Sequence, residues 1–252
     1  MALPATNNLS ISQINQELGR SATAQFSWND LEARRLAATG GSGQNQSAAT
    51  PFPISNLLGR ARNNIVVTGD QYDYNLSTAT QGNYSSGKTY TTLTVNGGVV
   101  IGASIVTNYA LTIGGNSGDI IDLYNNGYIV GAGGYGGKGK GGDGYNRGSA
   151  DDGYAGQDGG PAIYANYNFN VWNNGYIWGG GGGGGGTQGS NSGGKSRGPR
   201  WGGSGGGGAG QIVGAGGAGA VNSEQGTASA ASDGTLTAGG AGSSQTGQTG
   251  GN

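Results

Sequence analysis

The sequence predicts a mainly β protein in which a short-stranded, solenoid-like region runs into a bundle of polyglycine II helices, after a small helical module. Sixty-one of the 252 residues are glycine, about a quarter of the chain against a usual share of roughly 7%. Short apolar stretches rich in β-branched residues alternate with Gly and Asn corners, and the first long glycine run repeats every third residue. We therefore divide the chain into an N-terminal module (residues 1–62), a β region (63–130) and a glycine region (131–252).

The N-terminal module holds most of the helix-compatible sequence. We expect helices at residues 11–18 and 31–38 and a last short segment at 54–58. Ser10 stands three residues before Gln13, the spacing of a helix capping box, and a weaker pair of the same kind, Ser27 with Asp30, precedes the second helix. Helices this short are marginal alone, so they should pack on a partner or on the β region.

The β region consists of short apolar stretches that end in turn residues. Residues 89–95 are rich in β-branched side chains, Asn-Gly-Gly at 96–98 is a turn signal, and the strand resumes at 99–101. The same rhythm continues at residues 109–113, 120–124 and 128–130. Many short strands at close spacing fit a sandwich, a barrel or a solenoid, and we favour a solenoid-like stack.

An internal repeat connects the β region to the glycine region. Residues 125–131, Asn-Asn-Gly-Tyr-Ile-Val-Gly, recur 48 residues later as Asn-Asn-Gly-Tyr-Ile-Trp-Gly at 173–179. An alternating strand precedes each copy, and each copy runs directly into glycine. The Asn-Gly step suits a tight turn with positive φ. The predicted unit is therefore strand, turn, strand and glycine run.

The glycine runs have the period of a polyglycine II helix. Gly133, Gly136, Gly139 and Gly142 are spaced by three, and the polyproline II conformation has three residues per turn. Such a helix has no internal hydrogen bonds, but glycine lets neighbouring helices approach closely enough to pair N–H with C=O groups.

Two other structures compete for the glycine runs. The first is a flexible coil, because glycine loses more entropy on ordering than any other residue. The second is collagen, which we exclude because the chain has only five prolines and the Gly-X-Y period breaks within each run.

Composition excludes several classes of function. The chain has no histidine and no cysteine, so it cannot build a serine–histidine pair, a cysteine nucleophile or the usual zinc cages. A formal net charge of −1 argues against a general nucleic-acid partner. We expect no signal peptide and no membrane anchor. No enzymatic activity, cofactor or metal is predicted.

Two sets of motifs resemble known families. Residues 110–115 and 121–134 resemble glycine-rich tail proteins of tailed phages and, more distantly, the distal-fibre adhesins of T-even-like phages, whose glycine motifs form a polyglycine II sandwich. Residues 9–21 and 54–60 look like a module at the start of many phage virion proteins. The resemblance implies a virion protein, a tail fibre or tail-tip adhesin. Residues 1–62 would attach to a tail or baseplate protein, and the other end would bind a bacterial surface receptor, an outer-membrane protein or a polysaccharide.

The residues that would touch the receptor should lie in the connections between glycine runs, because the helices themselves expose little chemistry. Aromatic rings supply rigid contact area, and arginines supply forked donors for carboxylate, phosphate or sugar. The candidates are Tyr135, Lys138, Lys140, Tyr145, Arg147, Tyr154, Lys195, Arg197, Arg200 and Trp201. The competing interpretation is that these side chains only keep a glycine-rich protein soluble.

Two other functions stay open. One is a structural virion spacer or coat component that recognises nothing. The other is a carbohydrate-degrading tail enzyme, for which Asp151 and Asp152 with Asp143 or Asp158 could supply two carboxylates, although a glycine-flanked loop lacks a rigid scaffold for them. We expect a homotrimer, because the N-terminal core is small and the chain has no disulfides; the T-even adhesins favour a monomeric tip instead.

Overall fold

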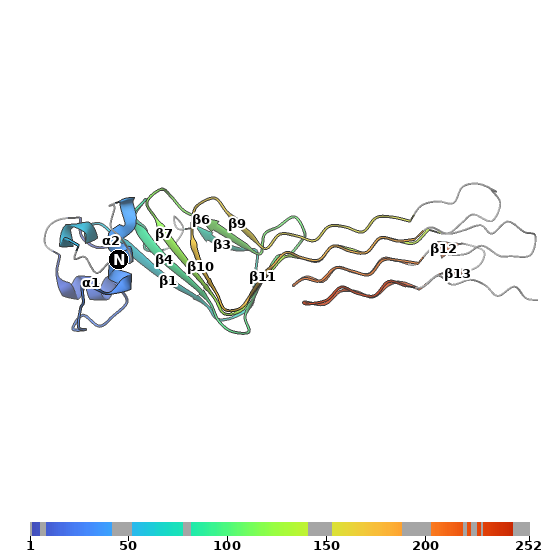
Figure 1. Cartoon of the computed structure of the whole chain (residues 1–252), viewed down its shortest axis with the longest axis horizontal. Helices are drawn as coiled ribbons and strands as arrows, with labels where there is room; N and C mark the ends of the chain where they lie inside the picture. Colours follow the sequence, from blue (N-terminus) through green and yellow to red (C-terminus); the bar gives the residue numbers. More distant parts are fainter. Residues whose placement is uncertain are drawn as a thin grey trace, which may run out of the picture.

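A computed structural model describes residues 2–5, 9–41, 52–77, 82–140, 153–187, 203–218, 221–222, 226–227 and 229–243. The molecule is elongated (Figure 1), with helices at one end, sheets in the middle and extended glycine segments at the other end. The prediction of a mainly β protein is confirmed. Among the described residues, no helix is long and apolar enough to span a membrane.

The N-terminal module folds as two short α-helices and two 3-10 turns. These are α1 (Ile11–Glu17), α2 (Leu31–Ala38), η1 (Thr39–Gly41) and η2 (Ile54–Leu57). The predicted capping box is present: the Ser10 side chain accepts from the Gln13 N–H, and the Gln13 side chain accepts from the Ser10 N–H. The second expected pair is wrong in detail, because Asp30 rather than Ser27 caps α2 by accepting from the N–H groups of Glu32 and Ala33.

The core of this module extends into the first sheet. Ile14 and Leu18 of the first helical segment pack with Leu36 and Leu57, and Tyr90 of the β region belongs to the same buried cluster. The short helices are therefore stabilised by tertiary packing rather than by propensity, as their length requires.

Three parallel sheets form the β region. The first contains β1 (Ala61–Val67), β4 (Thr89–Val95), β7 (Ile120–Asn125) and β10 (Asn170–Asn173). The second contains β2 (Gln71–Tyr72), β5 (Val100–Gly102), β8 (Tyr128–Val130) and β11 (Tyr176–Trp178). The third contains β3 (Tyr74–Ser77), β6 (Leu111–Gly114) and β9 (Ile163–Ala165). The chain visits the sheets in a fixed order, and each strand pairs in parallel with its counterpart from the preceding round.

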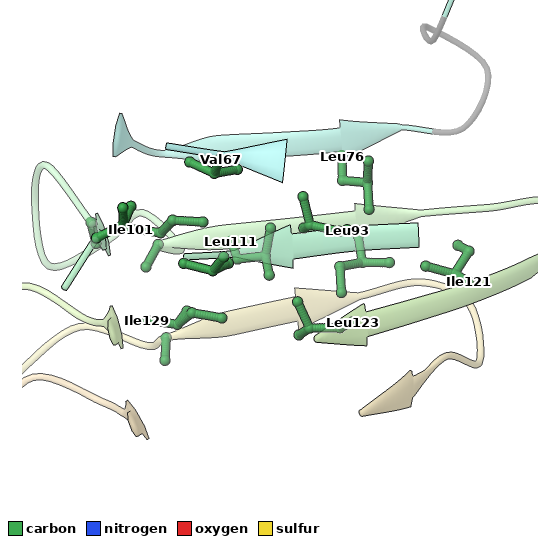
Figure 2. Close-up of a cluster of buried hydrophobic side chains, with 14 of the residues drawn as sticks. Val67, Leu76, Leu93, Ile101, Leu111, Ile121, Leu123 and Ile129 are labelled. Carbon is green, nitrogen blue, oxygen red and sulfur yellow. The ribbon is translucent and has the colours of Figure 1, made fainter. Parts of the chain in front are cut away.

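The core of the β region lies between these sheets and is built from aliphatic side chains (Figure 2). Paired positions of neighbouring strands carry the same residue type: Leu93 pairs with Leu123, and Ile101 pairs with Ile129. All four side chains are fully buried. Each round of the chain therefore adds one aliphatic layer to a continuous core.

The repeat at an interval of 48 residues corresponds to two successive rounds stacked on each other. Asn173 pairs with Asn125, and Tyr176 pairs with Tyr128. The Asn125 amide donates to the Asn173 side-chain oxygen at 2.7 Å, and the two tyrosine rings stack with centroids 5.2 Å apart. These matched side chains hold the register of the final round.

The positive-φ turn expected at the Asn-Gly steps is wrong. Neither Gly127 nor Gly175 has positive φ. A Cβ on Gly127 would lie 2.3 Å from the Val99 carbonyl oxygen, and one on Gly175 would lie 2.1 Å from the Gly127 carbonyl oxygen. Glycine is required at this corner because consecutive rounds approach backbone to backbone, not because the turn is left-handed.

The glycine region is a set of extended segments that lie side by side in Figure 1. Segment 131–140 shows how they pair. Gly134 and Gly137 donate their N–H groups to Gly181 and Gly184 (2.9 and 2.8 Å), and Gly136 donates to Ala215 at 2.8 Å. The carbonyls of Tyr135 and Lys138 accept from Gln157 and Tyr154 (2.8 and 3.0 Å). The carbonyls of Gly134 and Gly137 also accept from Gly208 and Gly205 (2.8 and 2.9 Å). Hydrogen bonds to each neighbour recur every third residue, so this segment pairs with four others. The small antiparallel pair β12 (Val221–Asn222) and β13 (Gly226–Thr227) completes the described elements.

Candidate functional site

Four of the ten predicted contact residues lie in the described part of the chain. Tyr135, Lys138, Lys140 and Tyr154 are on two adjacent segments of the glycine region, 131–140 and 153–160. The remaining six lie outside the described residues: Tyr145, Arg147, Lys195, Arg197, Arg200 and Trp201. Asp143, Asp151 and Asp152, proposed as possible carboxylates for sugar hydrolysis, also lie outside them.

The period of three decides which residues of these segments face outward. A Cβ on Gly134 would lie 1.9 Å from the Gln157 carbonyl oxygen, and one on Gly136 would lie 2.0 Å from the Gly205 carbonyl oxygen. Two positions in each triplet therefore face neighbouring backbone. The third position of segment 131–140 carries Ala132, Tyr135 and Lys138. Ala132 is buried against the aliphatic core of the β region, whereas Tyr135 and Lys138 are exposed.

Four exposed side chains and the half-buried Lys140 form a cluster that we call the Tyr135–Tyr154 cluster: Tyr135, Lys138, Lys140, Tyr154 and Gln157. Backbone pairing between segments 131–140 and 153–160 brings them together, with Tyr154 opposite Lys138 and Gln157 opposite Tyr135. Both tyrosines are 55% exposed. The Lys140 Nζ lies 5.5 Å from the centre of the Tyr154 ring, within the range of a cation–π contact.

Sequence reasoning did not select Gln157, and it considered Asp158 only as a possible carboxylate for sugar hydrolysis, although both are exposed on segment 153–160. The missed signal is the spacing of Gly153, Gly156 and Gly159, which all face segment 179–187 and leave the two residues between them free. Beside the cluster, a cavity of about 260 Å³ is lined by Tyr135, Gln157, Ile105 and Ile212, among others. The cluster can therefore offer aromatic, amide and ammonium groups next to an apolar recess.

A second exposed surface lies at the opposite end of the molecule, on the N-terminal module. Trp28 contacts Phe26 and Phe52 edge to face, with ring centroids 4.9 and 5.3 Å apart. Trp28 is more than one-third exposed, whereas Phe26 is half-buried and Phe52 is buried. We call Phe26, Trp28 and Phe52 the aromatic patch. An exposed tryptophan supported by other rings is typical of protein interfaces.

A buried ion pair fixes the N-terminal module to the β region. The Arg35 Nη1 lies 2.8 Å from the Asp122 carboxylate, which also accepts from Tyr90 at 3.0 Å and Asn170 at 2.9 Å. The Arg35 guanidinium lies 5.0 Å from the centre of the Trp172 ring. Burial raises the pKa of the Asp122 carboxyl, and the Asn170 hydrogen bond and the charge of Arg35 oppose this shift. One side chain of α2 thus contacts both β7 and β10.

Ionic contacts also surround Arg62 at the start of the first sheet. Its backbone N–H donates to the Glu17 carboxylate at 2.6 Å, and its guanidinium pairs with Glu32. Among the described residues, no group of three or more acidic residues is placed to hold a metal ion. The described charges therefore join the module to the β region rather than form a metal centre.

Comparison with known proteins gives one family match. A family model described as phage tail fibre adhesin Gp38 matches residues 62–252. None of the curated proteins compared with the chain matches it. Among solved structures, the gp37-gp38 adhesin tip complex of the bacteriophage S16 long tail fiber matches with a TM-score of 0.43 and 22% sequence identity, over 87% of this chain and 79% of that chain.

Proposed function

The chain belongs to the phage tail fibre adhesin Gp38 family, and we propose that two separate regions of the chain carry receptor binding and attachment to the tail. As a member of that family it is a tail fibre adhesin of the virion, with a role in host recognition. In our proposal the glycine region presents the receptor-binding side chains, and the N-terminal module attaches the protein to the tail. The receptor would be an outer-membrane protein or a polysaccharide of the bacterial surface.

One observation carries this division: two separate regions of an elongated molecule expose aromatic side chains suited to binding. The Tyr135–Tyr154 cluster lies on the extended segments next to the β region, and Trp28 of the aromatic patch lies in the loop before α2 of the N-terminal module. The family match begins at residue 62, where the proposed N-terminal module ends. This supports treating residues 1–62 as a module with a role of its own, which we propose is attachment.

We further propose that the β region is a three-sided β-solenoid and that the glycine region is a polyglycine II bundle. Three parallel sheets visited in a fixed order support the first proposal. Hydrogen bonds that recur every third residue between segment 131–140 and four neighbouring segments support the second, because three residues complete one turn of this helix. The bundle would act as a rigid scaffold, and the outward positions would carry recognition.

The same proposal includes a non-enzymatic adhesin that assembles as a homotrimer. All four residues of β10 are exposed, so the first sheet ends on an open edge that a neighbouring subunit could cover. Light scattering on the purified protein would then give three times the 24.7 kDa chain mass. A mass of one chain would support the monomeric tip instead.

One experiment distinguishes the three candidate functions. Purified protein is incubated with envelope preparations of the host. Specific retention supports the adhesin, and release of oligosaccharide supports a carbohydrate-degrading enzyme. If neither retention nor release is observed, the result supports a structural spacer.

Replacing Arg197, Arg200 and Trp201 together with serine should abolish retention and phage adsorption while particles still assemble. Unchanged adsorption would exclude these residues from the receptor site.

A further inference from the structure

Three Asn-Gly steps lie at one corner of the β region. They are residues 96–97, 126–127 and 174–175. Each step joins a strand of the first sheet to the following strand of the second sheet. The corners of successive rounds are hydrogen-bonded: the Asn126 N–H donates to the Val95 carbonyl at 2.9 Å, and the Asn174 N–H donates to the Asn125 carbonyl at 2.8 Å. The same dipeptide therefore occurs three times in closely related surroundings.

An Asn-Gly step can lose ammonia without an enzyme. The glycine nitrogen attacks the side-chain carbonyl carbon of the asparagine, and the new C–N bond closes a five-membered imide. The side-chain nitrogen leaves as ammonia and takes the proton of the attacking N–H. Water then opens the imide to aspartate or isoaspartate. Glycine favours this reaction because it has no side chain to hinder its nitrogen, but the glycine N–H and the asparagine amide must both be free to move.

Hydrogen bonds restrain the second and third steps. The Gly127 N–H donates to the Asn125 side-chain oxygen at 3.2 Å, and the Gly175 N–H donates to the Asn125 carbonyl at 3.0 Å. The two asparagine side chains are paired as well, because the Asn174 amide donates to the Asn126 side-chain oxygen at 3.1 Å. Backbone of the preceding round also crowds both glycines. These two steps therefore require local opening before they can react.

The first step lacks these restraints. Within the described part of the chain, the Gly97 N–H donates to no group and the Asn96 side chain makes no hydrogen bond. Gly97 is exposed, and a Cβ there would come no closer than 3.8 Å to any atom beyond its chain neighbours. The turn is closed instead by the Val99 N–H, which donates to the Asn96 carbonyl at 3.2 Å. Exposure of the asparagines alone would give the opposite order, since Asn126 and Asn174 are exposed and Asn96 is half-buried.

We propose that Asn96 is a site of spontaneous deamidation in the folded protein, with the Gly97 nitrogen as the nucleophile. Asn126 and Asn174 are protected from the same reaction. The product carries a new carboxylate at the corner between β4 and β5. In the isoaspartate product the main chain runs through the former side chain, which lengthens this corner by one carbon atom. The Asn96 N–H donates to the Val67 carbonyl at 3.1 Å, so the added length acts on a corner that is bonded to the preceding round.

The test follows all three steps in one sample. The purified full chain is incubated in mildly alkaline buffer, which favours attack by the glycine nitrogen, both folded and in denaturant. Peptide mapping by mass spectrometry then measures the aspartate and isoaspartate formed at each step. In the folded protein we expect Asn96 to convert at least about tenfold faster than Asn126 or Asn174, because those two must first open locally. In denaturant the three steps should react at similar rates.

Gly97→Ala is the matched variant, because a Cβ fits at this position but hinders the nitrogen. It should slow conversion at Asn96 several-fold without lowering the thermal stability of the fresh protein. Equal conversion at the three steps of the folded protein would overturn the proposal. So would an unreactive Asn96 in the folded protein when the denatured chain reacts. Unchanged conversion in Gly97→Ala would also overturn it, because the Gly97 nitrogen would then not be the nucleophile.

Discussion

The interior of the β region consists of side chains, whereas the interior of the glycine region consists of backbone. The β region buries side chains: Leu93, Leu123, Ile101 and Ile129 stack in layers between parallel sheets. The glycine region buries backbone, and most of its interior positions have no room for a Cβ. Stability in the first comes from apolar burial, and in the second from backbone hydrogen bonds between neighbouring segments.

This difference sets how much of each surface is free for function. In the β region, alternate residues of the strands are needed in the core, and matched side chains such as Tyr128 and Tyr176 hold the register. In the glycine region, Tyr135 and Lys138 are exposed, so we expect their exchange to disturb the scaffold little. A lattice of backbone is therefore well suited to a variable recognition surface.

The largest expected effect is a substitution inside the backbone lattice. Gly136→Val places side-chain atoms where a Cβ alone would already lie 2.0 Å from the Gly205 carbonyl oxygen. Neighbouring backbone cannot move aside as a side chain can, so we expect a loss of more than about 4 kcal/mol. Hydrogen exchange should show unfolding of the glycine region with the β region still protected. Tyr135→Val, one residue earlier, is the matched control and should be tolerated.

The second prediction concerns the buried ion pair between Arg35 and Asp122. Arg35→Met leaves the Asp122 carboxylate buried without its ion pair and should cost about 3–5 kcal/mol at neutral pH. The substitution raises the pKa of Asp122 further. A folded-state pKa above the unfolded value gives stability that is present at low pH and lost as pH rises through it. The loss of stability caused by Arg35→Met should therefore increase with pH.

Chemical denaturation of Arg35→Met from pH 4 to 8 checks this prediction. In the double variant Arg35→Met with Asp122→Asn, the loss of stability should be nearly independent of pH. Among the described residues, no charged side chain is buried in the glycine region. Its local unfolding, measured by hydrogen exchange and corrected for intrinsic rates, should therefore show little pH dependence. A strong dependence there would show that the two interiors do not differ in this respect.

The third prediction measures side-chain burial directly. Leu123→Ala removes a fully buried side chain from the layered core and should cost about 2–5 kcal/mol, as expected for a cavity that relaxes only in part. Thermal unfolding of the β region is the measurement. Val171→Ala on β10, where the side chain is exposed, should change stability by less than about 0.5 kcal/mol. Equal effects at both sites would contradict the layered core.

Features that depend on local chemistry could be predicted from the sequence. The capping box at Ser10, the repeat at an interval of 48 residues and the period of three in segment 131–140 all follow from spacing. Which strands pair could not be predicted. Between parallel neighbours such as β4 and β7, the chain first passes through a strand of each of the other two sheets. The reason for glycine at Gly127 and Gly175 was missed for the same cause, since the close approach is to another round of the chain.

The candidate site could also be predicted only in part from the sequence. Sequence reasoning selected Tyr135 and Tyr154 by residue type, but could not tell that backbone pairing between two segments brings them to one surface. It also passed over Gln157, because a glutamine in a glycine-rich stretch looks like any solubilising residue. Only the antiparallel pairing of segments 131–140 and 153–160 turns these positions into a cluster.

The smallest expected effect on stability is at the outward positions, and it separates scaffold from recognition. Tyr135→Ser with Tyr154→Ser should change the free energy of unfolding by less than about 0.5 kcal/mol per site, because both side chains are more than half exposed. Adsorption of phage carrying this pair should nevertheless fall by at least about tenfold, since exposed aromatic anchors dominate interface energy. Tyr164→Ser, at an exposed tyrosine of β9, is the control, and phage carrying it should adsorb normally. Normal adsorption by the double variant would move recognition away from these segments, and a large loss of stability would mean that outward side chains of the lattice also support the fold.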